Sequence, residues 1–379
     1  MKWVFWLAAG LIAYTYVGYA CWLRLRMLWR FRPVQRWSYV SAPDTPLVSI
    51  VMVVRNEEQI LETKLQNLLG LDYPADRCQI IVISDGSTDR TEEILREYGR
   101  DARIHIVLNQ LAQGKASGLN DAIELAQGDI VLFTDARQTI EAGALRLLVE
   151  NFADPDVGCA SGELMLGDAT GGESGQGLGL YWRTEKQVRK LESASGSVVG
   201  ATGAIYTVRR ELLTRVPAEL ILDDVYLPMQ VVRQGKRVIL DERARAWDHP
   251  NLGTGREFSR KVRTLSGNYQ LLQVAPWLLS KSNPIRFEFV SHKLLRLAVP
   301  FALAALLAAS FWLTGPFYRG ILILQLVFYG LSLLALSRLV KGGVLARMAD
   351  AAGTFVLLNG AAVVALANFV RGRRAAWTR

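Results

Sequence analysis

Cysteine and histidine are scarce in this sequence, with only three of each among 379 residues. The cysteines stand far apart, at Cys21, Cys78 and Cys159, and form no C-x-x-C pair. An odd number of widely spaced cysteines argues against a disulfide framework, and the missing C-x-x-C pairs argue against a cysteine-based zinc site. The composition therefore favours a reducing compartment for the central part of the chain.

The sequence also lacks internal repeats, and its one biased stretch is the glycine-rich segment 167–179, which we interpret as a loop. Positive charge is in excess, with 44 Lys and Arg against 35 Asp and Glu. Many of these cations directly follow the first apolar segment, at Arg24, Arg26, Arg30, Arg32 and Arg36. A basic collar of this kind is typical of contact with anionic lipid headgroups, so we predict a lipid bilayer as partner and no nucleic acid.

Long apolar runs are confined to the two ends of the chain. Residues 3–23 are long enough to cross about 30 Å of hydrocarbon as a helix. A cleaved signal peptide ending near Ala20 is the alternative, but the arginines lie after the segment, which favours an uncleaved anchor. The positive-inside rule then places the N-terminus outside and the chain from Arg24 onward in the cytoplasm.

Apolar segments near the C-terminus are further candidate membrane spans. Two are clear, at 294–314 and 321–337, and 354–370 is a third candidate. Three crossings would leave the basic tail 371–374 outside, against the positive-inside rule. The sequence leaves open whether the rule is broken or one segment does not cross. Before them, 258–273 has the pattern of an amphipathic helix at the membrane surface.

The central region alternates between expected strands and expected helices. Apolar runs predict strands at 48–54, 79–84, 103–108 and 129–134, with helices expected between them at 58–69, 91–98 and 117–126. Such a series predicts a Rossmann-like α/β domain with a mostly parallel sheet covered by helices on both faces. Further along, we expect strands at 157–166, 198–208 and 237–247 and helices at 180–191 and 224–234.

Two of the expected strands end on an aspartate, at Asp85 and Asp135. In open parallel sheets, ligands bind beyond the carboxyl ends of the strands, so both side chains are expected to face one pocket. The alternative is that each aspartate only caps the helix that follows it.

Seven motifs occur in an order that resembles one family, at 55–57 (RNE), 84–87 (SDGS), 114–120 (GKASGLN), 134–136 (TDA), 200–203 (GATG), 223–224 (DD) and 260–263 (RKVR). Together they resemble the membrane-embedded family 2 glycosyltransferases, such as the synthases of cellulose, chitin, hyaluronan and poly-N-acetylglucosamine. The resemblance covers residues 48 to about 273. It implies a GT-A-type α/β domain in the cytoplasm, flanked by transmembrane helices.

This resemblance divides the chain into six parts. They are an N-terminal transmembrane helix at 1–25, a basic, proline-containing linker at 26–46, the GT-A domain at 47–252, amphipathic interface helices at 253–292, C-terminal transmembrane segments at 293–371 and a basic tail at 372–379.

On the donor side, the resemblance implies that Asn56, Glu57, Asp85, Lys115, Asp135 and Arg263 bind a UDP-sugar. Glu57 and Asp85 would meet the base and ribose, and Lys115 the base or diphosphate, while Asn56 also orders its loop. Asp135 would hold Mg²⁺ or Mn²⁺, which prefer oxygen ligands and substrate phosphates. The family has a second Asp where this chain has Arg137, so Arg137 is expected to meet a phosphate or a nearby carboxylate, and the metal role of Asp135 is weakened.

On the acceptor side, the resemblance assigns Asp224 as general base, in a pair with Asp223. Asp223 is expected to cap the following helix or to help bind the acceptor, together with Gly200, Thr202 and Gly203. The polymerising members carry Gln-x-x-Arg-Trp, and this chain has Arg260 and Arg263 as phosphate-binding or gating cations. Thr264 stands where the Trp would stack on the acceptor.

The function implied is an inverting glycosyltransferase of the bacterial inner membrane. It would move a sugar from a UDP-sugar to a growing polysaccharide or lipid-linked glycan, with other polysaccharide-synthesis or export proteins as partners. The sequence leaves open whether the transfer is coupled to translocation of the polymer. Loss of the Trp favours an alternative, a transferase that adds a single sugar to a lipid-linked acceptor. A second alternative is an inactive membrane scaffold that binds sugar nucleotides.

Overall fold

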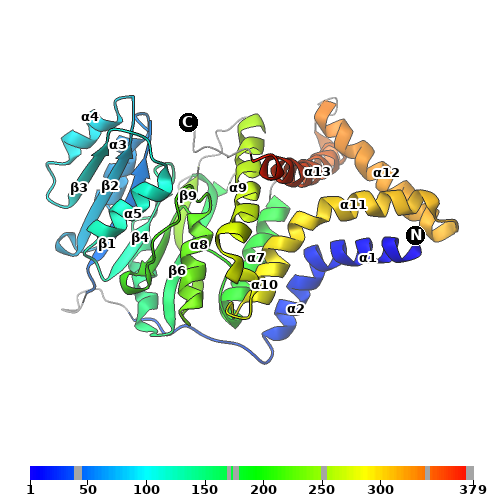
Figure 1. Cartoon of the computed structure of the whole chain (residues 1–379), viewed down its shortest axis with the longest axis horizontal. Helices are drawn as coiled ribbons and strands as arrows, with labels where there is room; N and C mark the ends of the chain where they lie inside the picture. The colour runs from blue at the N-terminus through cyan, green and yellow to red at the C-terminus, as the bar shows by residue number, and fades with distance from the viewer. Residues whose placement is uncertain (38–44, 169–171, 174–178, 249–253, 338–341, 373–379) are drawn as a thin grey trace.

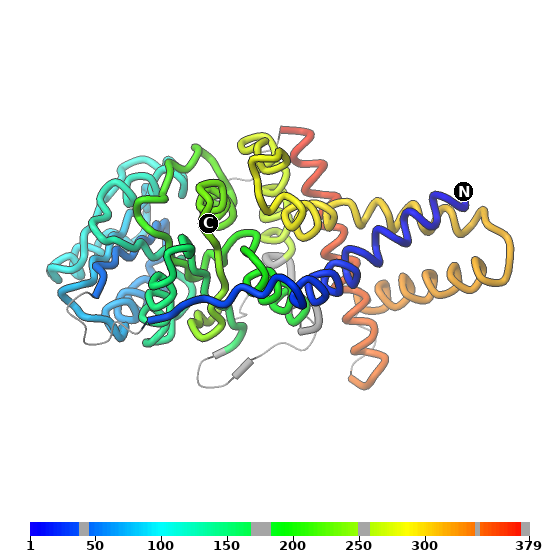
Figure 2. Tube along the Cα trace, turned by 90° about the horizontal axis from the view of Figure 1, so that it is seen from below, coloured from blue at the N-terminus to red at the C-terminus, as the bar shows by residue number. Residues whose placement is uncertain are grey.

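The computed structural model describes residues 1–37, 45–168, 172–173, 179–248, 254–337 and 342–372. An α/β domain and a group of long helices lie side by side, and the N-terminus is at the far end of the helices (Figures 1 and 2). The glycine-rich segment 167–179, the linker and the basic tail fall wholly or partly outside the described residues.

Four parallel strands form one half of the sheet. β1 (Val48–Val54) lies between β2 (Cys78–Asp85) and β4 (Ile130–Phe133), and β3 (Ile104–Asn109) pairs with the outer side of β2. Every residue of β1, β2 and β4 is buried, as expected for a parallel sheet covered on both faces. The register brings the carboxyl ends of these strands to one edge, where Asp85 and Asp135 follow.

The other half of the sheet is mixed. β8 (Tyr206–Arg209) runs antiparallel between β4 and β6 (Val157–Asp168), and β6 is parallel to β9 (Arg237–Asp248). The short strands β5 (Thr139–Ile140) and β7 (Gly172–Glu173) pair with β9 and β6. The strand order is β3-β2-β1-β4-β8-β6-β9-β5.

One expected strand is mostly wrong. Of the range 198–208, only the part from residue 206 onward is extended in the sheet. Gly200 has φ +88°, and the backbone amide of Ala201 donates to the carbonyl of Asp224, so this stretch turns away to contact another element. The apolar residues and glycines of 198–205 therefore make a loop, not a strand.

Apolar cores fill both faces of the sheet. Alternate residues of β1 belong to opposite cores, with Val51 and Val53 in one and Ile50 and Met52 in the other. The first core is covered by α5 (Lys115–Leu125), α8 (Asp223–Arg233) and α9 (Thr254–Val274). The second is covered by α3 (Leu61–Leu69), α4 (Thr91–Tyr98) and α6 (Ala144–Glu150).

Four helices of the described chain are long and apolar enough to cross a membrane. The first, Lys2–Arg26, comprises α1 (Lys2–Ala13), a π-helical turn and α2 (Tyr19–Arg26). The second, Arg286–Trp312, comprises α10 (Arg286–Phe289), a second π-helical turn and α11 (Leu295–Trp312), so it begins before the expected boundary at residue 293. The others are α12 (Pro316–Ser337) and α13 (Gly343–Val370).

These helices do not all run in the same direction. α1 packs alongside α11, and α12 turns back toward the α/β domain (Figures 1 and 2). α13 instead runs crosswise to α1 and α11 and packs on α9, where Tyr269 stacks on Phe369 with ring centroids 5.5 Å apart. The course of α13 therefore differs from that of a fourth parallel span.

A buried polar network joins the long helices to α7 (Gly179–Ser195) of the α/β domain. His292 contacts Glu192 at 2.8 Å through Nδ1 and Glu185 at 2.9 Å through Nε2. The hydroxyl of Tyr19 donates to the same Glu192 at 2.7 Å, and Arg26 pairs with Glu288. Both the first and the second long helix are thus fixed to one helix of the α/β domain.

Candidate active site

A lysine and two aspartates form the centre of the site. Lys115 is the first residue of α5, and its Nζ lies 3.0 Å from Asp135 Oδ1 and 3.1 Å from Asp223 Oδ1. Asp135 follows β4, and Asp223 is the first residue of α8. Three elements distant in sequence therefore meet at one ammonium group. Only 17% of the Lys115 side chain is exposed, which argues against a solvated lysine at a helix end.

Asp223 does not cap its helix, in contrast to one of the expectations from sequence. The residue at the N-cap position of α8 is Leu222, and no side chain caps the helix there. The Asp223 carboxylate faces Lys115 instead. Its attraction to the ammonium explains why the side chain turns away from the helix amides.

The carboxylates of Asp135 and Asp224 both face Gly203. A Cβ atom at Gly203 would lie 3.3 Å from Asp135 Oδ2 and 3.5 Å from Asp224 Oδ2. The loop that carries Gly203 is fixed at both sides, since the amide of Ala201 donates to the carbonyl of Asp224 at 2.7 Å and that of Thr202 to Ser161 Oγ at 3.1 Å. The loop therefore brings the expected acceptor residues against the expected base.

The charges of this cluster shift its pKa values in opposite directions. Burial alone would raise the pKa of Asp135, but the neighbouring Lys115 ammonium outweighs burial and holds that pKa below its usual range. Burial, together with the carboxylate of Asp223, raises the pKa of Asp224 to about 6. Asp135 is thus held ionised while Asp224 takes up a proton more readily, a combination that suits a general base near neutral pH.

Asp85 organises the loop that leads to Lys115. The side chain is fully buried, and its two oxygens accept the backbone amides of Gln113 at 2.7 Å and Gly114 at 2.9 Å. It does not cap a helix, because α4 begins only at Thr91. Asp85 and Asp135 therefore lie on either side of the segment 113–115, which is how the two strand ends come together.

Asn56 and Glu57 lie in the loop after β1. Asn56 has a left-handed backbone, with φ +53°, and its Oδ1 accepts the amide of Thr88 at 2.8 Å. The amide of Glu57 donates to Thr91 Oγ1 at 2.9 Å. Asn56 thus orders the two neighbouring loops, as expected. Contact of Asn56 and Glu57 with the sugar-nucleotide donor remains a prediction.

Arg137 meets a carboxylate, one of the two partners expected for it. Its Nη2 lies 2.5 Å from Oδ2 of Asp248, the last residue of β9. Arg260 of α9 approaches the same oxygen at 3.6 Å, and Gln138 Nε2 at 3.4 Å. The two expected phosphate-binding cations Arg137 and Arg260 are thus drawn to a buried aspartate.

Arg263 lies on α9 and is half-buried, and its side chain forms no hydrogen bond or ion pair with the other described residues. The structure does not bring it into the aspartate cluster. Thr264, at the position of the missing Trp, is exposed, and its hydroxyl donates to the carbonyl of Arg260 at 3.0 Å. No aromatic ring therefore stands at this position of α9.

A divalent cation fits this donor set only with help from a substrate. Among the described residues, no group of three or more His, Cys, Asp or Glu side chains could hold a metal ion. Arg137 has no acceptor atoms, so Asp135 is the only ligand left at the two acidic positions of the motif. One carboxylate together with the phosphates of a nucleotide is a normal environment for Mg²⁺ or Mn²⁺. Asp135 would hold such an ion.

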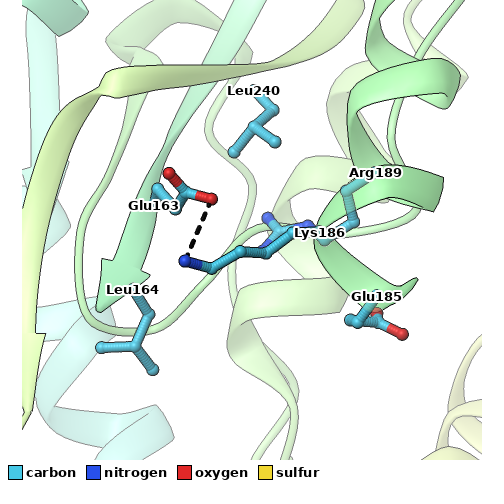
Figure 3. A pocket seen from close by; sticks show the side chains of 6 residues that line it. All are labelled: Glu163, Leu164, Glu185, Lys186, Arg189 and Leu240. Carbon is cyan, nitrogen blue, oxygen red and sulfur yellow. Dashed lines mark ion pairs between the residues drawn. The ribbon is translucent and has the colours of Figure 1, made fainter. Parts of the chain in front are cut away.

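A separate small cavity lies against α7 (Figure 3). Its volume is about 20 Å³, room for about one water molecule. It is lined by Glu163, Leu164, Glu185, Lys186, Arg189 and Leu240, and Glu163 and Lys186 form an ion pair across it at 3.4 Å. None of the site residues expected from sequence lines it, and it is too small for a sugar.

Sequence reasoning missed two residues of this region. Asp248 gave no signal of its own, because its partner is distant in sequence. Lys64 of α3 binds the segment that carries Asp135, and it interrupts the apolar stripe of its helix, between Leu61 and Leu68. A lysine on the buried face of a helix was the signal that could have identified it.

Comparisons with known proteins point to one family. Residues 49–216 match the family model "Glycosyl transferase family 2". The poly-β-1,6-N-acetyl-D-glucosamine synthase of Staphylococcus aureus (strain COL) is 24% identical over 253 residues, 62% of this chain and 59% of that protein. The synthase of the same name from Staphylococcus epidermidis is 23% identical over 249 residues, 63% of this chain and 58% of that protein. The match thus spans less than two thirds of these relatives' length.

One solved structure is similar over nearly its whole length. It is the mannosyltransferase from Pyrobaculum calidifontis in complex with GDP-Man and Mn²⁺. Its TM-score is 0.73 at 22% sequence identity, and the likeness covers 98% of this chain and 99% of that one. At this identity the likeness shows a shared fold.

Proposed function

We propose that this chain is a family 2 glycosyltransferase, which moves a sugar from a UDP-sugar to a hydroxyl group of a glycan or lipid-linked glycan, with inversion at the anomeric carbon. The observation that carries the proposal is the pair of carboxylates, Asp135 and Asp224, that face each other across Gly203. One is held ionised by Lys115, and the other has a raised pKa. Donor chemistry and acceptor chemistry would meet at this point.

Asp224 would act on the acceptor. Its carboxylate accepts the proton of the acceptor hydroxyl while that oxygen forms a bond to the anomeric carbon. The bond from the anomeric carbon to the phosphate oxygen breaks on the opposite side, and the nucleoside diphosphate leaves with the electron pair. Gly203 has no side chain at the position that lies 3.3 and 3.5 Å from an oxygen of each carboxylate, so the acceptor could approach the backbone there.

The leaving diphosphate carries negative charge that needs compensation. A divalent ion held by Asp135 would supply a Lewis acid there when bound. Lys115 is the cation that this chain itself places at the site, and its ammonium is also a suitable partner for phosphate. Arg137 forms an ion pair with Asp248, so we propose that it orders the turn that carries Asp135, the donor turn, and does not bind phosphate.

Four helices of the described residues are long and apolar enough to cross a membrane, which supports a membrane protein with this site next to a bilayer. We further propose that its α/β domain lies in the cytoplasm, at the inner membrane of a bacterium, because the arginine collar follows the first span. A growing polysaccharide or a lipid-linked glycan would then be the acceptor, with other synthesis or export proteins as partners.

Two observations favour the second candidate, single addition to a lipid-linked acceptor. Thr264 offers no aromatic surface for a sliding polymer. α13 runs crosswise to α1 and α11, so fewer parallel helices remain to surround a channel. An inactive scaffold explains less well why Asp85, Lys115, Asp135 and Asp224 converge on one site.

Product size decides between the candidates. Purified protein in nanodiscs would be incubated with Mn²⁺ and a panel of radiolabelled UDP-sugars, with GDP-mannose for comparison, and the products would be sized and extracted into organic solvent. A polymer supports the polysaccharide synthase, and a single lipid-soluble product supports single addition. Release of no nucleoside diphosphate from any donor would contradict both and favour the scaffold.

A further inference from the structure

A buried lysine lies beneath the turn that carries Asp135. Lys64 belongs to α3, and only 3% of it is exposed. Its Nζ donates to Thr134 Oγ1 at 2.9 Å and to the carbonyl of Gln138 at 2.7 Å. The two acceptors stand on either side of Asp135 and Arg137, so one ammonium group spans the turn.

Asn67 binds the next part of the same segment. Its Nδ2 donates to the carbonyl of Ile140 at 2.8 Å, and its Oδ1 accepts the amide of Ile140 at 2.9 Å. Lys64 and Asn67 are three residues apart, so they share one face of α3. Their hydrogen bonds fix the segment 134–140 to the helix at three places.

The same contacts reach the loop on the acceptor side. Thr134 Oγ1, which accepts from Lys64, donates to the carbonyl of Ala204 at 2.8 Å. Ala204 follows Gly203, the glycine between the two carboxylates. Lys64 is therefore connected through one hydroxyl group to both loops of the site.

The core itself does not require a lysine at this position. The partners of Lys64 Nζ among the described residues are a hydroxyl and a carbonyl, not a carboxylate, and burial lowers its pKa to about 7 against the opposing effect of Asp135. Burying a cation without a paired carboxylate is unfavourable, and an apolar side chain of the same length would pack as well. What the ammonium group does here is donate hydrogen bonds to the two acceptors of the turn, Thr134 Oγ1 and the carbonyl of Gln138.

We propose that Lys64 and Asn67 are positioning residues of the donor site, which hold the segment 134–140 so that Asp135 faces the diphosphate. This inference rests on the function proposed above. In a motif with two aspartates, a bound ion could fix the turn at both ends. Here Arg137 stands at that place and pairs with Asp248, so contacts within the protein fix the turn.

Three variants and a control test the proposal on the full-length protein. Lys64→Met removes the charge and the hydrogen bonds, Lys64→Gln keeps a donor without charge, and Asn67→Ala releases Ile140. Leu65→Met is the matched control, because Leu65 is fully buried on the same helix and belongs to the apolar core. Three properties are measured for each: hydrogen exchange of the peptide 134–140 without ligand, binding of UDP and of GDP with Mn²⁺ by calorimetry, and the unfolding temperature.

We expect faster exchange of 134–140 in Lys64→Met and at least tenfold weaker nucleotide binding, with an unfolding temperature equal to or above that of the wild type. Asn67→Ala should resemble it in exchange and binding, Lys64→Gln should be intermediate, and Leu65→Met should leave exchange and binding unchanged. The combination of a stable fold with weaker binding separates positioning from a plain structural role.

Unchanged exchange and binding in Lys64→Met would overturn the proposal. So would a parallel fall in the unfolding temperature, since the lysine would then serve the fold as a whole. If the wild type binds neither nucleotide, the proposed function fails, and the exchange of 134–140 still decides whether Lys64 holds the turn.

Discussion

Arg137 Nη2 lies 2.5 Å from Oδ2 of Asp248, and this pair connects the donor turn to the end of β9. The motif that Asp135 begins resembles one with a second acidic residue at this position, so an internal ion pair stands where the resemblance implies a metal ligand. Only 4% of the Asp248 side chain is exposed, and Arg260 of α9 approaches the same oxygen. The pair therefore links the donor turn, the sheet and the helix that packs on α13.

Loss of this pair should cost stability. We expect Arg137→Met to lower the free energy of unfolding by about 1.5–3 kcal/mol, because a buried carboxylate loses a charged hydrogen-bond donor. Asp248→Asn should cost more, since it also weakens the contacts of Arg260 and Gln138. The double variant should cost less than the sum of the two, as measured by denaturant unfolding in detergent. Simple additivity would show that the two residues do not interact in solution.

Asp224→Asn should lower the rate of transfer by about 10²–10⁴-fold, the usual contribution of a general base. Binding of the nucleotide should be preserved, because Asp224 is assigned to the acceptor. Calorimetry with the nucleotide and a turnover assay separate the two effects. Transfer at the wild-type rate would show that another group removes the proton.

The pH dependence of transfer should report the raised pKa of Asp224. A base must be ionised to act, so kcat/KM should fall tenfold per pH unit below about 6 and level off above it. Asp223 raises the pKa of Asp224, so Asp223→Asn should move the acidic limb of the profile, where kcat/KM falls, to lower pH. A limb near the ordinary pKa of an aspartate, about 4, in the wild type would contradict the assignment.

Gly203→Ala should impair transfer without unfolding the protein. The added methyl group would enter the space between the two carboxylates, at distances of 3.3 and 3.5 Å, without a severe clash. We expect kcat/KM to fall at least tenfold, with an unchanged unfolding temperature. Gly200→Ala is the contrasting variant, because φ +88° makes any side chain there costly to the fold itself. Full activity in Gly203→Ala would mean that substrates do not occupy this space.

The crosswise course of α13 predicts the side of the C-terminus. If α1, α11 and α12 cross the bilayer and α13 does not, the tail after Val370 lies on the same side as the α/β domain, in agreement with the positive-inside rule. A cysteine placed in the tail should therefore react with a membrane-impermeant maleimide only in inverted vesicles, like a cysteine on the α/β domain. Labelling in intact cells would show that α13 crosses.

Much of the fold could be predicted from local patterns. Apolar runs such as 48–54 identify strands buried on both faces, and the motifs point to family 2 glycosyltransferases, whose family model matches residues 49–216. The apolar residues of 198–205 predict a strand, but a tertiary contact between Ala201 and Asp224 turns this segment into a loop.

The site could be predicted as a set of residues but not as a set of contacts. The motifs brought Lys115, Asp135, Asp223 and Asp224 together by family order. The ion pair of Lys115 with Asp223 and that of Arg137 with Asp248 both depend on how loops distant in sequence pack together. The direction of α13 is equally absent from the sequence, because hydropathy gives the length of a helix and not its course.

The stereochemistry of the first turnover tests the central claim most directly. With an α-linked UDP-sugar that the protein consumes, the anomeric configuration of the new bond would be read by NMR. A single displacement with Asp224 as base across from the leaving diphosphate predicts a β-linked product. An α-linked product would contradict the account, because the attack would then not come from the side opposite the diphosphate.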